Sequence, residues 1–227
     1  SIPLRDLKED DPRYLIMATR AGEVKRIELS AFKNIRSNGI KAFDLEEGDE
    51  LKWFELTDGN EEIVLVTHLG MSIRFPETDI RPSGRQAGGV RGINLREGDY
   101  VVGMGIVRKG AELLVATDKG YGKRSVLEHY RSQKRGGYGL RTMKLTAKTG
   151  NIVSTQVVVP DDRVMLISIN GIIIKFSVKE IRSTGRSTQG VSVMKLNPGD
   201  SLANIAVIPN IDEAEEAIKS KPVPVKA

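Results

Sequence analysis

The chain has 227 residues and a formal net charge of +5, from 35 Lys and Arg against 30 Asp and Glu. This length allows a substantial core, while the charge is only moderately basic, so net charge alone does not identify a nucleic-acid binder. The absence of cysteine excludes disulfides and thiolate metal sites, and two histidines leave little for a zinc site. No apolar run approaches the roughly 18 residues of a membrane span, and residues 1–13 lack a signal-peptide core. We therefore expect a cytoplasmic protein without a metal or a membrane partner.

A segment of about 50 residues recurs four times along the chain. Its first glycine returns at intervals of 48, 50 and 51 residues, at Gly22, Gly70, Gly120 and Gly171. A later loop glycine returns at intervals of 50, 50 and 51 residues, at Gly39, Gly89, Gly139 and Gly190. This self-similarity is typical of stacked units that bury their apolar faces against one another. We expect a lead-in at 1–13, one domain over 14–209 with repeats at about 14–57, 62–108, 112–160 and 163–209, and a mobile polar tail at 210–227.

Each repeat contains four short runs rich in β-branched, aromatic and other apolar residues, separated by glycine turns. In chain order these predicted strands are 14–19, 23–29, 39–45 and 51–57; 62–67, 71–76, 89–95 and 100–107; 112–118, 121–127, 139–145 and 151–159; and 164–169, 172–178, 190–196 and 201–208. Four antiparallel strands in 40 to 50 residues fit an all-β propeller blade. The first run of each repeat is almost continuously apolar, which predicts an inner strand buried on both faces. The second run alternates, so that Arg74 is expected to point away from Ile73 and Phe75, towards solvent or a partner.

Basic residues keep the register of the repeat in three columns. Four positions after the first glycine stand Arg26, Arg74, Arg124 and Lys175. Eleven positions after it stand Lys33, Arg81, Arg131 and Arg182. The glycine loops open with Arg36, Arg85, Lys134 with Arg135, and Arg186, and neighbouring basic residues are Arg91, Lys123 and Arg141.

These columns predict a basic rim that binds a polyanion. Duplex DNA carries about one negative charge per 1.7 Å of axis, so a row of cations on successive blades can follow its backbone. The glycines allow main-chain amides to approach phosphate oxygens. The competing interpretation is a set of hairpin turns with solvated charges. Gly120 to Ser125 lacks the spacing of a phosphate-binding loop, and no repeated His or carboxylate cluster indicates a catalytic centre.

Several long stretches closely resemble the C-terminal domain of the DNA gyrase A subunit. They include YLIMATRAGEVKRIELSAFKNIRSNGIKAF, LTDGNEEIVLVTHLGMSIRF, IRPSGRQAGGVRGINLREGDYVVGMGIV and TDKGYGKRSVLEHY. The resemblance covers about residues 13–209, and the homologous topoisomerase IV domain is the near neighbour. It implies a β-pinwheel, a propeller-like disc of six blades in which adjacent blades exchange a strand and a basic rim wraps DNA. The four blades here resemble the later ones, so the resemblance also implies one blade without its exchanged strand and an exposed strand edge.

The resemblance further implies a DNA-wrapping role in an ATP-driven type II topoisomerase that introduces negative supercoils. The implied partners are double-stranded DNA, gyrase B and the rest of the gyrase A subunit, in an A2B2 assembly. ATP and magnesium act elsewhere in that enzyme, so we expect no cofactor and no catalytic residue in this segment. An alternative from another class is a protein-interaction propeller that binds an acidic partner.

One loop is similar to the family's signature heptad, QRRGGKG. It comprises Gln133, Lys134, Arg135, Gly136, Gly137, Tyr138 and Gly139. The family heptad lies in the first blade, whereas this loop lies in the third repeat and carries Tyr138 where a basic residue is usual. We therefore interpret it as the equivalent loop of a later blade.

Overall fold

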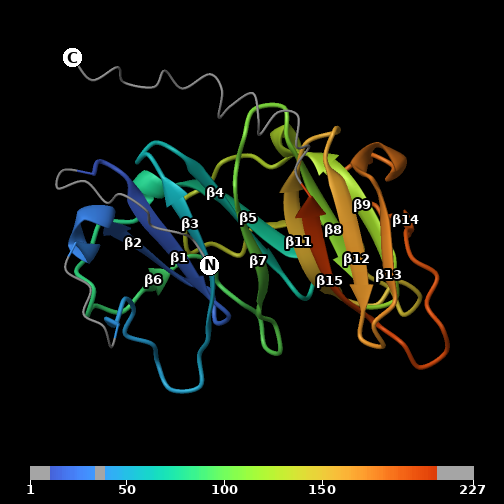
Figure 1. Ribbon diagram of the computed structural model, residues 1–227, viewed down its shortest axis with the longest axis horizontal. Helices are drawn as coiled ribbons and strands as arrows, with labels where there is room; N and C mark the ends of the chain where they lie inside the picture. The colour runs from blue at the N-terminus through green and yellow to red at the C-terminus, as the bar shows by residue number, and fades with distance from the viewer. Residues whose placement is uncertain (1–10, 34–38, 209–227) are drawn as a thin grey trace, which may run out of the picture.

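The computed structural model describes residues 11–33 and 39–208. They form four antiparallel sheets that follow one another along the longest axis, from the first repeat in blue to the fourth in orange and red (Figure 1). The all-β architecture predicted from the repeats is confirmed. The predicted tail at 210–227 and most of the predicted lead-in at 1–13 lie outside the described residues. Within the described residues, no helix is long and apolar enough to cross a membrane.

Each repeat places its strands at the same positions. The first contains β1 (Tyr14–Thr19), β2 (Glu23–Glu28), the 3-10 helix η1 (Leu29–Phe32) and β3 (Leu51–Thr57). The second contains β4 (Glu62–Thr67), β5 (Met71–Pro76), η2 (Glu77–Asp79), β6 (Val90–Arg91) and β7 (Val101–Ile106). The third contains β8 (Glu112–Thr117), β9 (Tyr121–Val126), η3 (Leu127–His129), β10 (Leu140–Arg141) and β11 (Ile152–Val158). The fourth contains β12 (Arg163–Ser168), β13 (Ile173–Ser177), η4 (Val178–Glu180), β14 (Val191–Ser192) and β15 (Leu202–Ile208).

Adjacent repeats exchange a strand. The first sheet has the order β3-β1-β2-β6, so its outer strand belongs to the second repeat. The same exchange adds β10 to the second sheet and β14 to the third. In the part of the chain that the structure describes, the fourth sheet has three strands, β13-β12-β15, and β13 forms its edge. Ile173 on that edge is 58% exposed. The strand exchange and the open edge that the resemblance implied are therefore present.

The exchanged strands are much shorter than predicted. We expected seven-residue strands at 89–95, 139–145 and 190–196, whereas β6, β10 and β14 have two residues each. The reason is that each segment leaves the ladder to reach the hairpin turn of the preceding repeat. The Gly92 and Ile93 amides donate to Gly22 O, the Thr142 amide to Gly70 O, and the Val193 and Met194 amides to Gly120 O. The predicted strand at 39–45 is also wrong, because residues 39–45 contain no strand.

The hydrophobic core lies between the sheets. Alternate residues of β4 face opposite ways: Ile63 and Leu65 pack with the first sheet, and Val64 and Val66 pack with the third. Strand β8 repeats this arrangement and is buried along its whole length. Burial on both faces explains the almost continuous apolar runs, and that prediction is confirmed for these strands.

The innermost strand of each blade is the fourth one, and not the first as predicted. Strands β3, β7, β11 and β15 contact one another in chain order. Close approach there requires glycine, because a Cβ atom at Gly103 would lie 2.1 Å from Thr155 Cγ2. The small side chains of β7 therefore let β11 pack directly against it.

Aspartates fix the hairpin turn between the first two strands of each repeat. Asp49, Asp99 and Asp200 follow a glycine and accept a hydrogen bond from the amide of Ala21, Leu69 and Asn170, at 2.8, 2.9 and 3.1 Å. In the third repeat Asn151 takes the aspartate's place, and the bond is reversed. Asp118, in the turn itself, accepts from the Asn151 amide at 3.0 Å.

The first basic column joins neighbouring blades. Arg124 forms an ion pair with Glu112 of its own blade and donates from Nε to the Ile181 carbonyl of the next blade at 2.7 Å. Arg74 likewise pairs with Glu62 and donates to Leu127 O at 2.9 Å. We call each of these arginines, with its glutamate and its carbonyl partner on the next blade, an interblade latch. Arg74 does point away from its apolar neighbours, and its partner is the following blade.

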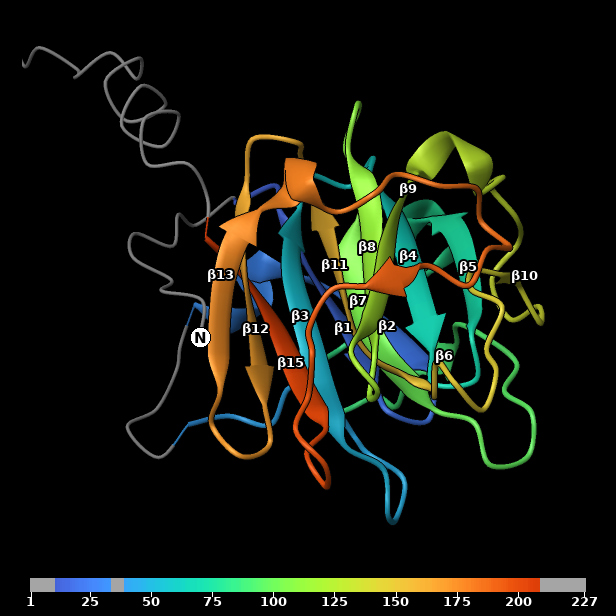
Figure 2. The same ribbon diagram turned by 90° about the vertical axis from the view of Figure 1, so that its right-hand side faces the viewer.

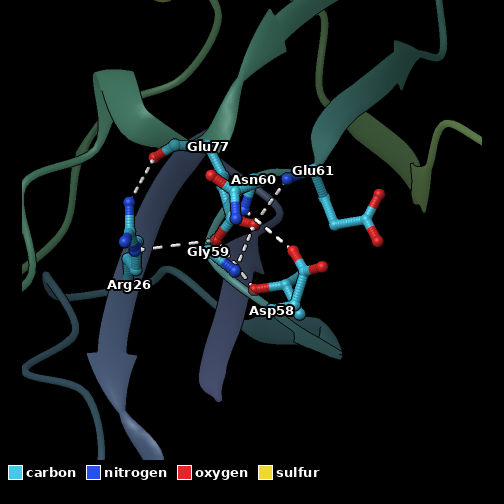
Figure 3. A network of polar contacts seen from close by, with 7 residues as sticks. Arg26, Asp58, Gly59, Asn60, Glu61 and Glu77 are labelled. Carbon is cyan, nitrogen blue, oxygen red and sulfur yellow. Dashed lines mark hydrogen bonds and ion pairs between the residues drawn. The ribbon is translucent and has the colours of Figure 1, made fainter. Parts of the chain in front are cut away.

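Arg26 makes the corresponding contact by a different route. Its guanidinium lies over Tyr14 at 3.8 Å and its Nη1 donates to Glu77 O at 3.3 Å. The Glu77 carboxylate is fully buried and accepts from Thr57 Oγ1 and from the Gly59 and Glu61 amides, at 2.7 to 3.1 Å. Figure 3 shows Arg26 and the 58–61 turn gathered around Glu77. The other repeats have the buried apolar residues Leu29, Leu127 and Val178 at this position.

We expect Glu112→Gln to lower the free energy of unfolding by about 2 to 4 kcal/mol, because it leaves the largely buried Arg124 charge uncompensated. Urea denaturation measures this. The control is Asp161→Asn, which removes the exposed ion pair with Lys179 and should cost less than about 1 kcal/mol. Equal effects of the two substitutions would show that the latch does not stabilise the array.

Asp200 makes the stability of the fold depend on pH through the hairpin turn of the fourth repeat. The Ser168 hydroxyl first, and then the Asn170 and Ser201 amides, lower the pKa of Asp200 by donating hydrogen bonds to its carboxylate. A depressed carboxylate pKa stabilises the fold above the pKa of the unfolded chain, and this stabilisation is lost as pH falls through the folded pKa. The unfolding temperature of Asp200→Asn should therefore fall less steeply than that of wild type below about pH 4. Parallel curves for the two proteins would refute this role.

Candidate nucleic-acid interface

Most of the predicted basic residues that are exposed belong to loops and exchanged strands, and Lys175 belongs to β13. The second basic column, Lys33, Arg81, Arg131 and Arg182, is exposed in every repeat. Arg91 and Arg141 end the exchanged strands β6 and β10 and are also exposed, as are Lys134 and Lys175. Figure 2 shows β10 beside β5 at the outer, right-hand side of the second sheet.

The glycine loops are held against the preceding blade by an arginine of the third column. Arg135 donates from Nε to Asp79 O at 2.9 Å and from Nη1 to Arg91 O at 3.0 Å. Arg186 makes the same pair of bonds one blade later, to His129 O at 3.1 Å and Arg141 O at 2.5 Å. In both cases the acceptors are the last residue of a 3-10 helix and the last residue of an exchanged strand. These arginines therefore fix the loops and remain half exposed.

Main-chain hydrogen bonds connect each loop to the repeat before it. The Asp44 amide donates to Ala87 O at 3.1 Å, the Asn94 amide to Gly137 O at 2.8 Å, and the Lys144 amide to Thr188 O at 3.0 Å. These three donors occupy one register of the repeat, and so do their acceptors. The basic loops consequently form a connected series from the second repeat to the fourth, which we call the basic rim.

The predicted residues thus differ in their surroundings and in their exposure. Arg26, Arg74 and Arg124 are occupied by the contacts between blades, and Lys123 is fully buried. A buried ammonium group cannot touch a phosphate, so the prediction that Lys123 contacts DNA is wrong for this structure. Arg85 is half buried, and Arg36 lies outside the described residues. The exposed members are Lys33, Arg81, Arg91, Arg131, Lys134, Arg141, Lys175 and Arg182.

The heptad-like loop 133–139 presents two side chains outward. Lys134 is exposed and Tyr138 is 56% exposed. The backbone of the loop is docked, since the Gly136 amide donates to Gly92 O at 2.6 Å. Gly139 has a φ of +71°, and a Cβ atom there would lie 2.2 Å from Ser72 O. The conformation of this loop therefore depends on its glycines, while Gln133 is half buried.

Sequence reasoning missed three exposed lysines of the rim. Lys41 occupies the same register as Arg91 and Arg141, and Lys144 and Lys195 share another register, five positions after the loop glycine. Lys41 pairs with Asp44, which partly neutralises it. The repeat register could have identified all three, if positions that are basic in only two or three of the repeats had also been considered.

The described residues offer no group of three or more His, Cys, Asp or Glu side chains arranged to hold a metal ion. His68 instead stacks on Tyr100, with ring centroids 4.5 Å apart, and its Nδ1 lies 2.8 Å from Ile152 O. His68 is thus engaged between the second and third repeats.

Comparison with known proteins agrees with this repeat structure. The family model for the DNA gyrase C-terminal domain, a β-propeller, matches residues 13–58, 61–108, 111–158 and 162–209. The chain is 42% identical to the A subunit of DNA gyrase from Staphylococcus epidermidis over 214 residues, or 93% of this chain and 24% of that protein. It is 38% identical to the A subunit of DNA gyrase from Chlamydia pneumoniae over 211 residues, or 92% of this chain and 25% of that protein. The chain therefore spans about a quarter of the length of these relatives.

Two solved structures share the fold. A crystal structure of the C-terminal domain of DNA topoisomerase IV superposes with a TM-score of 0.88 at 28% identity, covering 96% of this chain and 69% of that one. A structure of the DNA gyrase A C-terminal domain superposes with a TM-score of 0.80 at 27% identity, covering 91% of this chain and 73% of that one. The family model, the relatives and the exchanged four-stranded sheets agree, and the chain belongs to the family of DNA gyrase A C-terminal β-propeller domains.

Proposed function

We propose that this domain binds duplex DNA along the basic rim and bends it. The observation that carries the proposal is the connected series of basic loops, which the main-chain hydrogen bonds at Asp44, Asn94 and Lys144 hold in one register. Fixed cations at a regular spacing suit the phosphate backbone, which is uniform and independent of base sequence. The proposed contacts are the exposed predicted residues, together with Lys144 and Lys195. The exposed predicted residues are Lys33, Arg81, Arg91, Arg131, Lys134, Arg141, Lys175 and Arg182.

Bending sets how many contacts are needed. Bending 20 to 30 base pairs by 40 to 90° costs of order 1 to 6 kcal/mol. An isolated surface ion pair contributes no more than about 1 kcal/mol, so contacts on several blades must act together. Since each blade presents basic residues in the same register, the array supplies these contacts along one path.

The role in the whole protein follows from the relatives. We propose that the domain is part of a gyrase A subunit, which assembles with gyrase B as A2B2 in the bacterial cytoplasm. There it would present bent DNA for ATP-driven strand passage and negative supercoiling. The chemistry, with its ATP and magnesium, belongs to other parts of that enzyme, and this domain positions DNA.

Charge reversal tests the rim directly. The triple variant Arg81→Glu, Arg131→Glu and Arg182→Glu should weaken binding to a 100-base-pair duplex by about a hundredfold or more at low salt, because three attractive contacts become repulsive. A matched control reverses three exposed cations outside the basic loops, Arg96, Lys109 and Lys148. It should lose much less affinity. Equal losses would mean that only net charge matters, and unchanged binding of the first variant would refute the rim assignment.

The dependence on duplex length and salt separates bending from simple attraction. Affinity for duplexes of about 15 to 150 base pairs should rise to a plateau, since a longer duplex engages more blades. With six phosphates neutralised, log K should fall against log salt with a slope of about −5. Polyglutamate serves as the control for an acidic protein partner. Tight binding of polyglutamate with no dependence on DNA length would favour the protein-interaction alternative.

A further inference from the structure

Two buried lysines lie directly beneath basic loops. Lys25 on β2 is 1% exposed and Lys123 on β9 is fully buried. Both stand three positions after the first glycine of their repeat, at equivalent places in the first and third sheets. An unpaired ammonium group in such a position would be very unfavourable, so its partners show what it does.

The partners of Lys123 are in the loop of the following repeat and on its own strand. Its Nζ donates to Gly185 O at 2.8 Å, to Arg186 O at 2.6 Å and to Ser125 Oγ at 3.1 Å. Three donors therefore meet three acceptors, which is the full capacity of an ammonium group. Two of these acceptors belong to the loop that carries the rim arginine Arg186.

Lys25 makes the same arrangement two blades earlier. Its Nζ donates to Arg85 O at 2.9 Å, Ala87 O at 2.5 Å and Ala42 O at 3.0 Å. Again three donors meet three acceptors, and again two acceptors belong to the basic loop of the following repeat. Lys25 also lies 5.2 Å from the centre of the Phe43 ring.

The second blade provides an internal comparison. Ile73 stands in the place of the two lysines, and its Cδ1 lies 3.7 Å from where a Cβ atom on Gly137 would be. The loop above Ile73 is docked by its own backbone, because the Gly136 amide donates to Gly92 O. Among the described residues, this bond has no main-chain equivalent in the loops above Lys25 and Lys123. Those two loops instead accept hydrogen bonds from a buried lysine.

We propose that Lys25 and Lys123 are positioning residues of the rim: each buried ammonium group fixes the backbone of the basic loop of the next repeat in the conformation that meets DNA. Neither lysine touches DNA. Each acts through carbonyl groups of the loop, so that the loop needs little further ordering on binding. The proposal rests on the proposed DNA-binding function for its consequence, although the ordering of the loops can be measured without DNA.

The charge state of Lys123 supports this arrangement. Burial, and then the nearby positive charge of Arg186, lower the pKa of Lys123 to about 8. The Ser125 hydroxyl that accepts from Lys123 also contacts the Tyr130 hydroxyl, whose pKa burial raises, so Tyr130 stays neutral around pH 8. Above that pH the amine is uncharged, so its bonds to the Gly185 and Arg186 carbonyls lose their charge assistance. The loop at 185–188 should therefore loosen between about pH 7 and 9.

The test replaces the lysine by a side chain of similar length without charge. In Lys123→Met, amide hydrogen exchange of residues 185–188 should be faster than in wild type, and affinity for a 100-base-pair duplex should fall about three- to tenfold. Wild-type affinity should fall from pH 7 to pH 9 more steeply than that of the variant, because the variant has lost the titrating group. A purely structural role would not change this pH profile. Lys109→Met, which removes an exposed lysine, is the charge-matched control.

The outcomes are distinct. Unchanged loop exchange in Lys123→Met, or wild-type DNA affinity together with a wild-type pH profile, overturns the proposal. Faster loop exchange with no DNA binding by any variant, wild type included, refutes the proposed function but leaves the positioning role standing. If Lys123→Met does not fold, Lys123→Ile, which introduces the residue of the second blade, can replace it. Lys25→Met gives the same test in the first blade, where the amide hydrogen exchange of residues 85–87 is measured.

Discussion

The exchange of one short strand between consecutive repeats is the constraint on which the rest depends. Within the described residues, the next repeat pairs with the outer edges of β2, β5 and β9 through β6, β10 and β14. Each exchanged strand pairs with the preceding repeat. The amides that follow the strand also donate to the carbonyl of that repeat's hairpin glycine. The basic loop directly precedes that strand. The position of each basic loop therefore depends on these backbone hydrogen bonds, together with the side-chain bonds that Arg135, Arg186, Lys25 and Lys123 make to main-chain carbonyls.

Positive charge has three separate uses in this array. Arg74 and Arg124 each pair with a glutamate of their own blade and bridge to the next blade through the carbonyls of Leu127 and Ile181. Arg135 and Arg186 dock the loops on main-chain carbonyls, and Lys25 and Lys123 support two of the loops from beneath. Other cations, among them Arg81, Arg131 and Arg182, are exposed. Arg74 and Arg124 are neutralised by Glu62 and Glu112, whereas Arg81, Arg131 and Arg182 recur at one position of the repeat and are exposed.

The sequence predicts the repeats, the first, second and fourth strands and the register of the basic residues, since glycine turns and apolar periodicity are local properties. The basic columns alone do not distinguish the interblade latches from the basic rim, because both are basic and equally spaced. A further local signal does: Glu62 and Glu112 stand 12 residues before Arg74 and Arg124. The length of β6, β10 and β14 depends on bonds to another repeat, as does the burial of Glu77 at a position that is apolar elsewhere. Those features are tertiary, and no single-repeat pattern encodes them.

The most direct measurement is acetylation of lysines in the presence and absence of a long duplex, followed by mass spectrometry. The exposed rim lysines Lys134, Lys144 and Lys195 should be protected by DNA, whereas the exposed lysines Lys52, Lys109 and Lys179 should stay reactive. Lys123 should react slowly in both conditions, because its ammonium group is enclosed by the loop it supports. Protection of Lys52, Lys109 and Lys179 in preference to the rim lysines would contradict the assignment of the DNA path.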